Sequence, residues 1–247
     1  MGRRAAAALA MVAMAGCGRI GFSTGSNPDP DAKTTEPDAS TTARWTVVQN
    51  AATTSPTLTI ASSGAGHLIV VAVHLANLGS VSSITDNAPN GGNSYTAIAT
   101  ARATNTSPPD AVEMWFARDS IAGATTIAVA TSATIVGAVA WEASGIRTDT
   151  PLDTATTLDA QPATTTPFGP RITTSEPGEF VVSVAIVANG ISATHAGNEF
   201  TNDQRTRGNG WAHLTDPAAA AGVHQAEWDQ GVAGAYCGNA AAFRVGP

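Results

Sequence analysis

Charge is scarce in this 247-residue chain, and positive charge is the scarcer sign. Asp, Glu, Lys and Arg together make up 13% of the residues, Lys33 is the single lysine, and the formal net charge is −7. No basic cluster offsets this balance. Because nucleic-acid affinity rests largely on cationic side chains that release phosphate counterions, the composition excludes nucleic acid as a partner.

Amphipathic helices and membrane-spanning runs are also missing from the sequence pattern. No helical apolar periodicity lasts two turns beyond the N-terminal segment, and no later segment approaches the roughly 18 apolar residues of a membrane span. Instead, short runs rich in Val and Thr alternate with turn formers, a pattern typical of an antiparallel β-sandwich or barrel. The predicted strands are Leu58–Ala61, His67–Ala76, Ser94–Arg102, Val112–Arg118, Thr125–Thr131, Ile135–Ala143, Arg171–Thr174, Glu179–Ala188, Val223–Trp228 and Ala235–Val245.

The first residues predict an export signal over residues 1–16. Arg3 and Arg4 precede a short apolar stretch, which then meets the run Met14-Ala15-Gly16-Cys17. This run resembles the lipobox of bacterial lipoproteins, although methionine stands where leucine is usual. The resemblance implies that Cys17 is acylated and becomes the mature N-terminus. Ordinary secretion with an unmodified Cys17 is the alternative.

An acylated Cys17 would make the membrane a partner of the protein. Each buried methylene contributes about 0.8 kcal/mol, so more than one chain, such as palmitate, gives stable anchoring. By the same resemblance, Gly18 in place of aspartate favours the outer membrane. Loss of Arg3 and Arg4 with the leader leaves 12 − 2 = 10 basic against 19 acidic residues, a net charge of −9.

Residues 17–43 are expected to form a lipidated, disordered tether. From Ser23 to Ala43 the sequence is rich in Pro, Asp, Ser and Thr and has almost nothing to bury. A flexible segment of that length spans roughly 25 Å on average. The folded β-sandwich domain is expected to cover residues 44–247.

The predicted domain contains a faint internal repeat. Gly66–Asn77 parallels Gly178–Asn189, so that Trp115 and Trp228 fall at nearly equivalent places. Two related halves suit one jelly-roll sandwich, and they equally suit two tandem immunoglobulin-like sandwiches. A single jelly-roll-like domain is favoured, because Asp149–Pro170 lacks the charge expected of an exposed linker.

A succession of short segments extends across the domain: Gly66–Val73, Val81–Asp86, Tyr95–Ala97, Met114–Ala117 with Ala122-Gly123, Val139–Gly145 and Pro151-Leu152-Asp153. Their order resembles a β-sandwich module that recurs in secreted and surface-attached bacterial proteins. The similarity covers nearly all of Trp45–Val245 and rests on pattern rather than on a catalytic motif. It implies a fold and a location, and no activity.

Catalytic signatures are missing, so no catalytic residue is predicted. The five histidines have no HxH, HxxxH or HExxH spacing, and no Gly-x-Ser-x-Gly motif is present. Cys237 lies in an apolar run without an adjacent histidine or cation, which predicts a buried, inert thiol.

Three glutamates beside tryptophans leave a glycan-active hydrolase as the alternative to a binding protein. Because strand side chains alternate, Glu113 and Trp115 are expected to share one face of their strand, while Glu142 and Glu227 lie in other strands. A glycosidase needs two carboxyl groups roughly 5–10 Å apart. Solvated strand faces and edge protection explain the same residues.

One loop offers the only cofactor that the sequence suggests, a calcium ion. Asp86, Asn87, Asn90 and Asn93 supply hard oxygen atoms of the kind that Ca²⁺ prefers, but their spacing does not match an EF-hand. The same residue types are typical of a tight turn, so turn chemistry is favoured over a metal site.

A second loop is the main candidate for ligand binding. Arg205, Arg207 and Asn209 supply hydrogen-bond donors beside Trp211, an aromatic platform suited to a sugar or peptide. Trp115 and Glu113 form a further candidate contact. Packing of Trp211 into the sandwich is favoured over a ligand contact, since large apolar residues are usually buried.

These features favour an envelope lipoprotein without catalytic activity. It would bind a polysaccharide or an envelope protein, or serve a structural role. The hydrolase with paired carboxylates remains the alternative, and its test is whether two of the three glutamates converge in one cleft.

Overall fold

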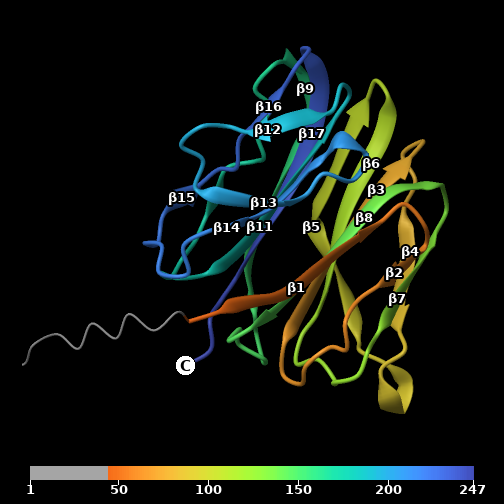
Figure 1. The fold of residues 1–247 in the computed structure, drawn as a ribbon, viewed down its shortest axis with the longest axis vertical. Helices are drawn as coiled ribbons and strands as arrows, with labels where there is room; N and C mark the ends of the chain where they lie inside the picture. Colours follow the sequence, from red (N-terminus) through yellow and green to blue (C-terminus); the bar gives the residue numbers. More distant parts are fainter. Residues whose placement is uncertain (1–43) are drawn as a thin grey trace, which may run out of the picture. The chain divides into compact units, whose positions relative to one another are not determined.

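The computed structural model describes residues 44–247, which consist largely of β-strands (Figure 1). The predicted leader, Cys17 and the predicted tether lie outside the described residues. Every strand pair in residues 44–247 is antiparallel, which confirms the predicted all-β antiparallel sandwich. No helix in this range has the length and apolar character of a membrane span.

Residues 46–144 form a first sandwich of two sheets. The larger sheet has the order β1-β8-β3-β6-β5, and the smaller has the order β2-β7-β4. The elements are β1 (Thr46–Thr53), β2 (Thr57–Thr59), β3 (Leu68–Ala76), β4 (Val81–Asp86), the short 3-10 turn η1 (Pro89–Gly91), β5 (Tyr95–Thr106), β6 (Pro109–Ala117), β7 (Thr126–Thr131) and β8 (Ile135–Ser144).

Residues 152–243 form a second sandwich. Its five-stranded sheet has the order β13-β14-β11-β17-β9, and two short pairs, β10-β15 and β12-β16, form the opposite layer. The elements are β9 (Leu152–Thr164), β10 (Ile172–Thr173), β11 (Phe180–Val187), β12 (Ile191–Thr194), β13 (Phe200–Gln204), the 3-10 turn η2 (Thr206–Gly208), β14 (Gly210–Leu214), β15 (Val223–His224), β16 (Trp228–Gln230) and β17 (Gly234–Phe243).

The two sandwiches share one strand order. Reading β9, β17, β11, β14 and β13 in place of β1, β8, β3, β6 and β5 converts one five-stranded sheet into the other. The order is jelly-roll-like, except that β5 pairs with β6 and leaves β4 at the edge of its sheet. The predicted repeats Gly66–Asn77 and Gly178–Asn189 contain the central strands β3 and β11. The jelly-roll-like pattern therefore occurs once in each half.

Three apolar cores hold the layers together, because both five-stranded sheets are covered on both faces. Val70 of β3 faces a core shared by the two sandwiches, and its neighbour Val71 faces the core under β2-β7-β4. Val182 of β11 also faces the shared core, while Val181 faces the third core. Figure 1 shows the small sheets on the outer sides. The largest fully buried side chains of the shared core are Trp141, Trp211, Phe180 and Phe243.

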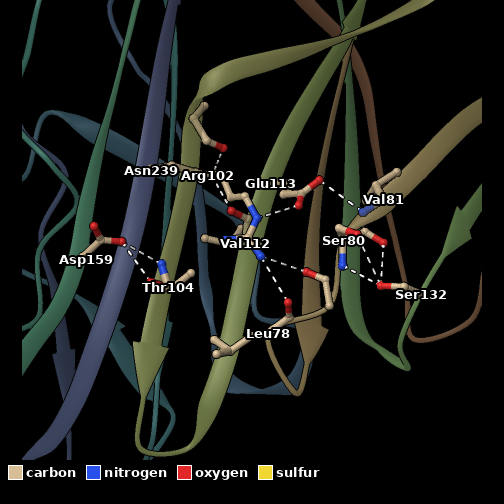
Figure 2. A network of polar contacts seen from close by, with 12 residues as sticks. Leu78, Ser80, Val81, Arg102, Thr104, Val112, Glu113, Ser132, Asp159 and Asn239 are labelled. Atoms are coloured by element: carbon tan, nitrogen blue, oxygen red, sulfur yellow. Dashed lines mark hydrogen bonds and ion pairs between the residues drawn. The ribbon is translucent and has the colours of Figure 1, made fainter.

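Polar side chains cross the shared core at its margins. Asp203 of β13 accepts a hydrogen bond from Trp141 Nε1 of β8 (2.8 Å). The amide nitrogen of Asn209 lies 2.9 Å from His74 Nδ1 of β3. Asn239 of β17 donates to a backbone carbonyl oxygen of β6 (3.3 Å; Figure 2). Because hydrogen bonds are directional, these contacts fix how one sandwich sits on the other.

Candidate functional site

The predicted aromatic platform does not reach the surface. The Trp211 side chain is fully buried in the shared core, and its Nε1 donates to the backbone oxygen of Thr206 (3.4 Å). Asn209 is 1% exposed and accepts a hydrogen bond from the backbone N–H of Val187 (3.2 Å). Burial of Trp211 is the favoured of the two sequence-based alternatives, and the ligand-contact alternative is wrong, because both faces of the five-stranded sheet are covered and β14 has no solvent-facing side.

The two arginines of the same loop stay on the surface without the tryptophan. Arg205 donates from Nη1 to the backbone oxygen of Ser192 in β12 (2.8 Å). Arg207 is exposed and lies in η2 with a φ of 57°. Arg205 therefore covers part of a sheet edge, a role that limits edge-to-edge association.

Glu113 and Trp115 share one face of β6, as predicted, but the smaller sheet covers that face. Figure 2 shows Glu113 beside Val81, the first residue of β4. Glu113 accepts hydrogen bonds from Arg102 Nε (2.8 Å) and from the backbone N–H of Val81 (3.2 Å). Both residues line a hollow of about 190 Å³ together with Arg102. This hollow is smaller than the roughly 300 Å³ at which ligand pockets begin. Glu113 is 8% exposed, and its charge serves an internal ion pair.

The three glutamates of the hydrolase hypothesis do not converge. Glu113 pairs with Val73 and Glu142 with Ile69 of the central strand β3. The two glutamates are separated by four residues along the strand direction and by two strand spacings across the sheet. Their backbones therefore lie roughly 16 Å apart. Glu227 lies in the other sandwich, next to β16. The carboxylates of Glu113 and Glu142 also have different partners, Arg102 and His67, so they do not form the shared pair that a glycosidase uses.

The loop that the sequence offers as a calcium site forms a turn instead. Asp86 Oδ1 accepts hydrogen bonds from the backbone N–H groups of Ala88 (3.1 Å) and Asn93 (3.0 Å). Asn87 Oδ1 accepts two from the backbone N–H groups of Thr125 (2.7 Å) and Thr126 (2.9 Å).

Asn90 adopts a left-handed backbone with a φ of 59°, as expected of a turn residue. Because the oxygens of Asp86 and Asn87 already accept hydrogen bonds from the protein, these residues do not fit a calcium ion.

Histidines pair with single carboxylates throughout residues 44–247. The pairs are His67–Glu142 (2.6 Å), His74–Asp110 (3.3 Å), His195–Asp229 (2.7 Å), His213–Asp203 (2.8 Å) and His224–Glu199 (3.0 Å). In the described part of the chain, no group of three or more His, Cys, Asp or Glu side chains is placed to hold a metal ion.

Burial shifts the protonation of two groups in opposite directions. Burial lowers the pKa of His74, although Asp110 opposes that shift. Burial, with the negative charge of Asp153 in addition, raises the pKa of Glu179. No sequence motif marks Glu179, whose carboxylate shares the backbone N–H of Ser175 with that of Asp153 (3.1 Å to each carboxylate).

Cys237 is fully buried, as predicted from its apolar surroundings. Burial raises the pKa of its thiol to about 12, and the charges of Asp110 and Asp159 add to the effect. A thiol with this pKa stays protonated near neutral pH, so it is a poor nucleophile.

An exposed polar groove lies where three loops of the described chain meet. Its volume is about 630 Å³, within the range of small-molecule sites. One wall comes from the end of the β4–β5 loop and the start of β5, the second from the β6–β7 loop and the third from the β8–β9 connection. The exposed polar residues that line it are Ser94, Thr96, Arg118, Asp119, Thr148 and Asp149.

The groove continues across the junction of the two sandwiches. A second hollow of about 510 Å³ shares Thr148 and Asp149 with it and adds Arg147 and residues 246–247. Arg118 donates a hydrogen bond to the backbone oxygen of Asp149, which ties two of the walls together. This groove could not be predicted from the sequence, because its walls come from segments that are distant in the sequence and carry no motif.

The comparisons with known proteins add no relative to this picture. No family model, no curated protein and no solved structure matches the chain.

Proposed function

We propose that this protein is a non-catalytic envelope lipoprotein that binds a neutral, polyhydroxylated polymer, a polysaccharide, in the polar groove. The lipobox-like run at Cys17 and the Pro-, Asp- and Thr-rich segment that follows it support anchoring on a tether. The separation of Glu113, Glu142 and Glu227 favours binding over hydrolysis.

The observation that carries the proposal is the chemistry of the groove. Hydroxyl groups of Ser94, Thr96 and Thr148 each donate and accept hydrogen bonds, as the hydroxyls of a sugar do. Asp119 accepts and Arg118 donates, so the two together suit neighbouring hydroxyls of one sugar ring.

The charges of the groove favour a neutral ligand. Arg118 and Arg147 are balanced by Asp119 and Asp149 across the two connected hollows. The chain as a whole is acidic, with a formal net charge of −7, so a polyanion would be repelled over longer range. An uncharged polymer adds no unbalanced charge to the groove and is not repelled by the net negative charge of the chain.

The length of the groove favours a polymer over a single sugar. The hollows of about 630 and 510 Å³ meet at Thr148 and Asp149, so adjacent units of one chain could occupy both. Loops on a rigid β-scaffold are a common place for such contacts.

The test is a binding screen on the lipid-free mature chain, residues 17–247 with Cys17→Ala. The panel contains neutral polysaccharides (dextran, mannan), an acidic one (polygalacturonate) and peptidoglycan fragments. We expect saturable binding of a neutral member, weakened about tenfold by Arg118→Ala or Asp119→Asn, since one hydrogen bond to a charged group contributes roughly 1.5 kcal/mol. Arg171→Ala and Asp216→Asn, at exposed positions of the second sandwich, are the matched controls.

Failure of every neutral polymer to bind would overturn the proposed ligand. Binding that survives both groove variants would overturn the proposed site. Anchoring is tested separately by labelling cells with radioactive palmitate, where the parent chain should incorporate label and the Cys17→Ala chain should not.

A further inference from the structure

One carboxylate organises the loop that forms the first wall of the groove. Asp86 Oδ1 accepts the backbone N–H groups of Ala88 (3.1 Å) and Asn93 (3.0 Å). Asp86 Oδ2 accepts the side-chain amide of Asn93 (2.6 Å) and the hydroxyl of Tyr95 (2.9 Å). These four contacts span the whole connection from β4 to β5.

The same network reaches the second wall through Asn93. The side-chain oxygen of Asn93 accepts a hydrogen bond from the backbone N–H of Ile121 (2.6 Å) in the β6–β7 loop. Asn93 and Ile121 both line the groove. The chain of contacts Asp86–Asn93–Ile121 therefore joins two loops that are far apart in the sequence.

The backbone packs as closely as the side chains around this carboxylate. Gly92 lines the groove with a φ of 85°, and a Cβ at this position would lie 2.8 Å from the backbone oxygen of Asp86. A side chain at Gly92 would therefore push the loop away from Asp86, and only glycine adopts this backbone without strain.

We infer that Asp86 is a positioning residue that pre-forms the groove by holding both loops through Asn93. The inference rests on the proposed function in taking the groove as the binding site. Loops that are already fixed lose less conformational entropy when a ligand binds, so affinity depends on residues that never touch the ligand.

The carboxylate form of Asp86 is the form that the network requires. Partial burial would raise its pKa, but the hydrogen bonds from Asn93, Ala88 and Tyr95 outweigh burial and hold the pKa of Asp86 below its ordinary value. All four contacts therefore persist at neutral pH.

The test exchanges the hydrogen-bond acceptor, Asp86, and the donor, Asn93. Asp86→Asn keeps one acceptor oxygen but places an NH₂ group against the donors of Asn93 and Tyr95. Asn93→Asp places two carboxylates together. The double variant Asp86→Asn/Asn93→Asp restores one donor and one acceptor, while Asp216→Asn in a turn of the second sandwich is the matched control, since its carboxylate accepts the backbone N–H of Ala218 (2.8 Å).

The first readout needs no ligand: amide hydrogen exchange at Asn93 and Ile121 in the lipid-free mature chain. We expect Asp86→Asn to speed exchange at both amides by about tenfold, and the double variant to return both rates close to the parent. Unchanged exchange in Asp86→Asn would overturn the inference.

The second readout is the affinity for dextran and mannan. We expect Asp86→Asn to weaken whichever of them the parent binds by about tenfold and the double variant to recover the loss. If Asp86→Asn alters exchange but binds as tightly as the parent, Asp86 does not position the binding site and the inference fails. If the parent binds neither polymer, the proposed function fails, and the exchange result alone decides whether Asp86 holds the loops.

Discussion

The two sandwiches have the same strand order, yet their loops are organised by different residues. In the first sandwich Asp86 holds the loop after β4, which borders the groove. In the second, Glu199 stands in the loop after β12, and its carboxylate contacts His224 Nδ1 (3.0 Å) and the backbone N–H of Gln225 (3.1 Å). The backbone oxygen of Glu199 also accepts the N–H of Thr215 (2.9 Å). The strand order determines which loops are neighbours, and single polar residues determine how each of these loops is held in place.

The edges of the smaller sheets also combine a common strand order with different side-chain contacts. Arg102 of β5 donates to the backbone oxygens of Leu78 (3.1 Å) and Gly79 (3.2 Å) beside β4 (Figure 2). Arg205, just after the corresponding strand β13, donates to Ser192 of β12 (2.8 Å). β5 and β13 pair with β6 and β14, which leaves β4 and β12 at the edges of the smaller sheets. The two arginines lie at these edges. Arg102 differs in that it also neutralises a buried glutamate.

Phe180→Ala tests whether the two sandwiches fold as one unit or independently. Phe180 is fully buried in the shared core, where its ring lies 5.1 Å from that of Trp45. Loss of this ring should cost about 3–5 kcal/mol of unfolding free energy. Because the core belongs to both sandwiches, we expect one cooperative transition in guanidinium chloride for the variant and for the parent.

The control is Val232→Ala, at a side chain that is 66% exposed, which should change the unfolding free energy by less than about 0.5 kcal/mol. Two separate transitions, with only one of them sensitive to Phe180→Ala, would show that the shared core does not couple the halves.

The two edge arginines, Arg102 and Arg205, should contribute unequally to stability. Arg102→Ala leaves Glu113, which is 8% exposed, without its cation, so it should cost about 2–3 kcal/mol. Arg205→Ala removes one contact to a carbonyl oxygen at an exposed side chain, so it should cost less than about 1 kcal/mol. Urea denaturation of both variants measures the difference, and equal losses would contradict a special role for the Arg102–Glu113 pair.

The strand pattern of the chain could be predicted where apolar runs are continuous. β3, β8 and β11 are buried along nearly their whole length, and their predicted ranges match the structure closely. β9 was missed, because Leu152–Thr164 is rich in Thr and lies at a sheet edge with only partial burial. Partial burial on an edge leaves no apolar alternation for a sequence reading to detect.

The candidate sites were harder to predict, for a different physical reason. Alternation placed Glu113 and Trp115 correctly on one face of β6, but it could not show that another layer covers that face. The burial of Trp211 likewise depends on a sheet contributed by the other half, so its own loop offered both a core residue and a ligand contact. Asp119 and Thr148 are 29 positions apart in sequence and meet only because the strand order brings their loops together.

His74 in the first sandwich and Glu179 in the second should make stability depend on pH in opposite directions. The pKa of His74 is lowered from 6.5 in the folded state, so the unfolded chain takes up a proton first as the pH falls below that value. His74 therefore makes the protein less stable as the pH falls from 6.5 towards the folded pKa. The pKa of Glu179 is raised from 4.5, so the folded chain holds its proton to higher pH than the unfolded chain does.

Glu179 therefore makes the protein less stable as the pH rises from 4.5 through the folded pKa, and ionised Glu179 keeps that cost at neutral pH. Glu179→Gln should raise the melting temperature more at pH 7.5 than at pH 4, while the matched variant Glu176→Gln, at a side chain that is 41% exposed, should show a smaller difference. Thermal unfolding across this pH range measures both. An equal gain in melting temperature at the two pH values would contradict a raised pKa of Glu179. Only a difference in pKa between the folded and unfolded states makes this gain depend on pH.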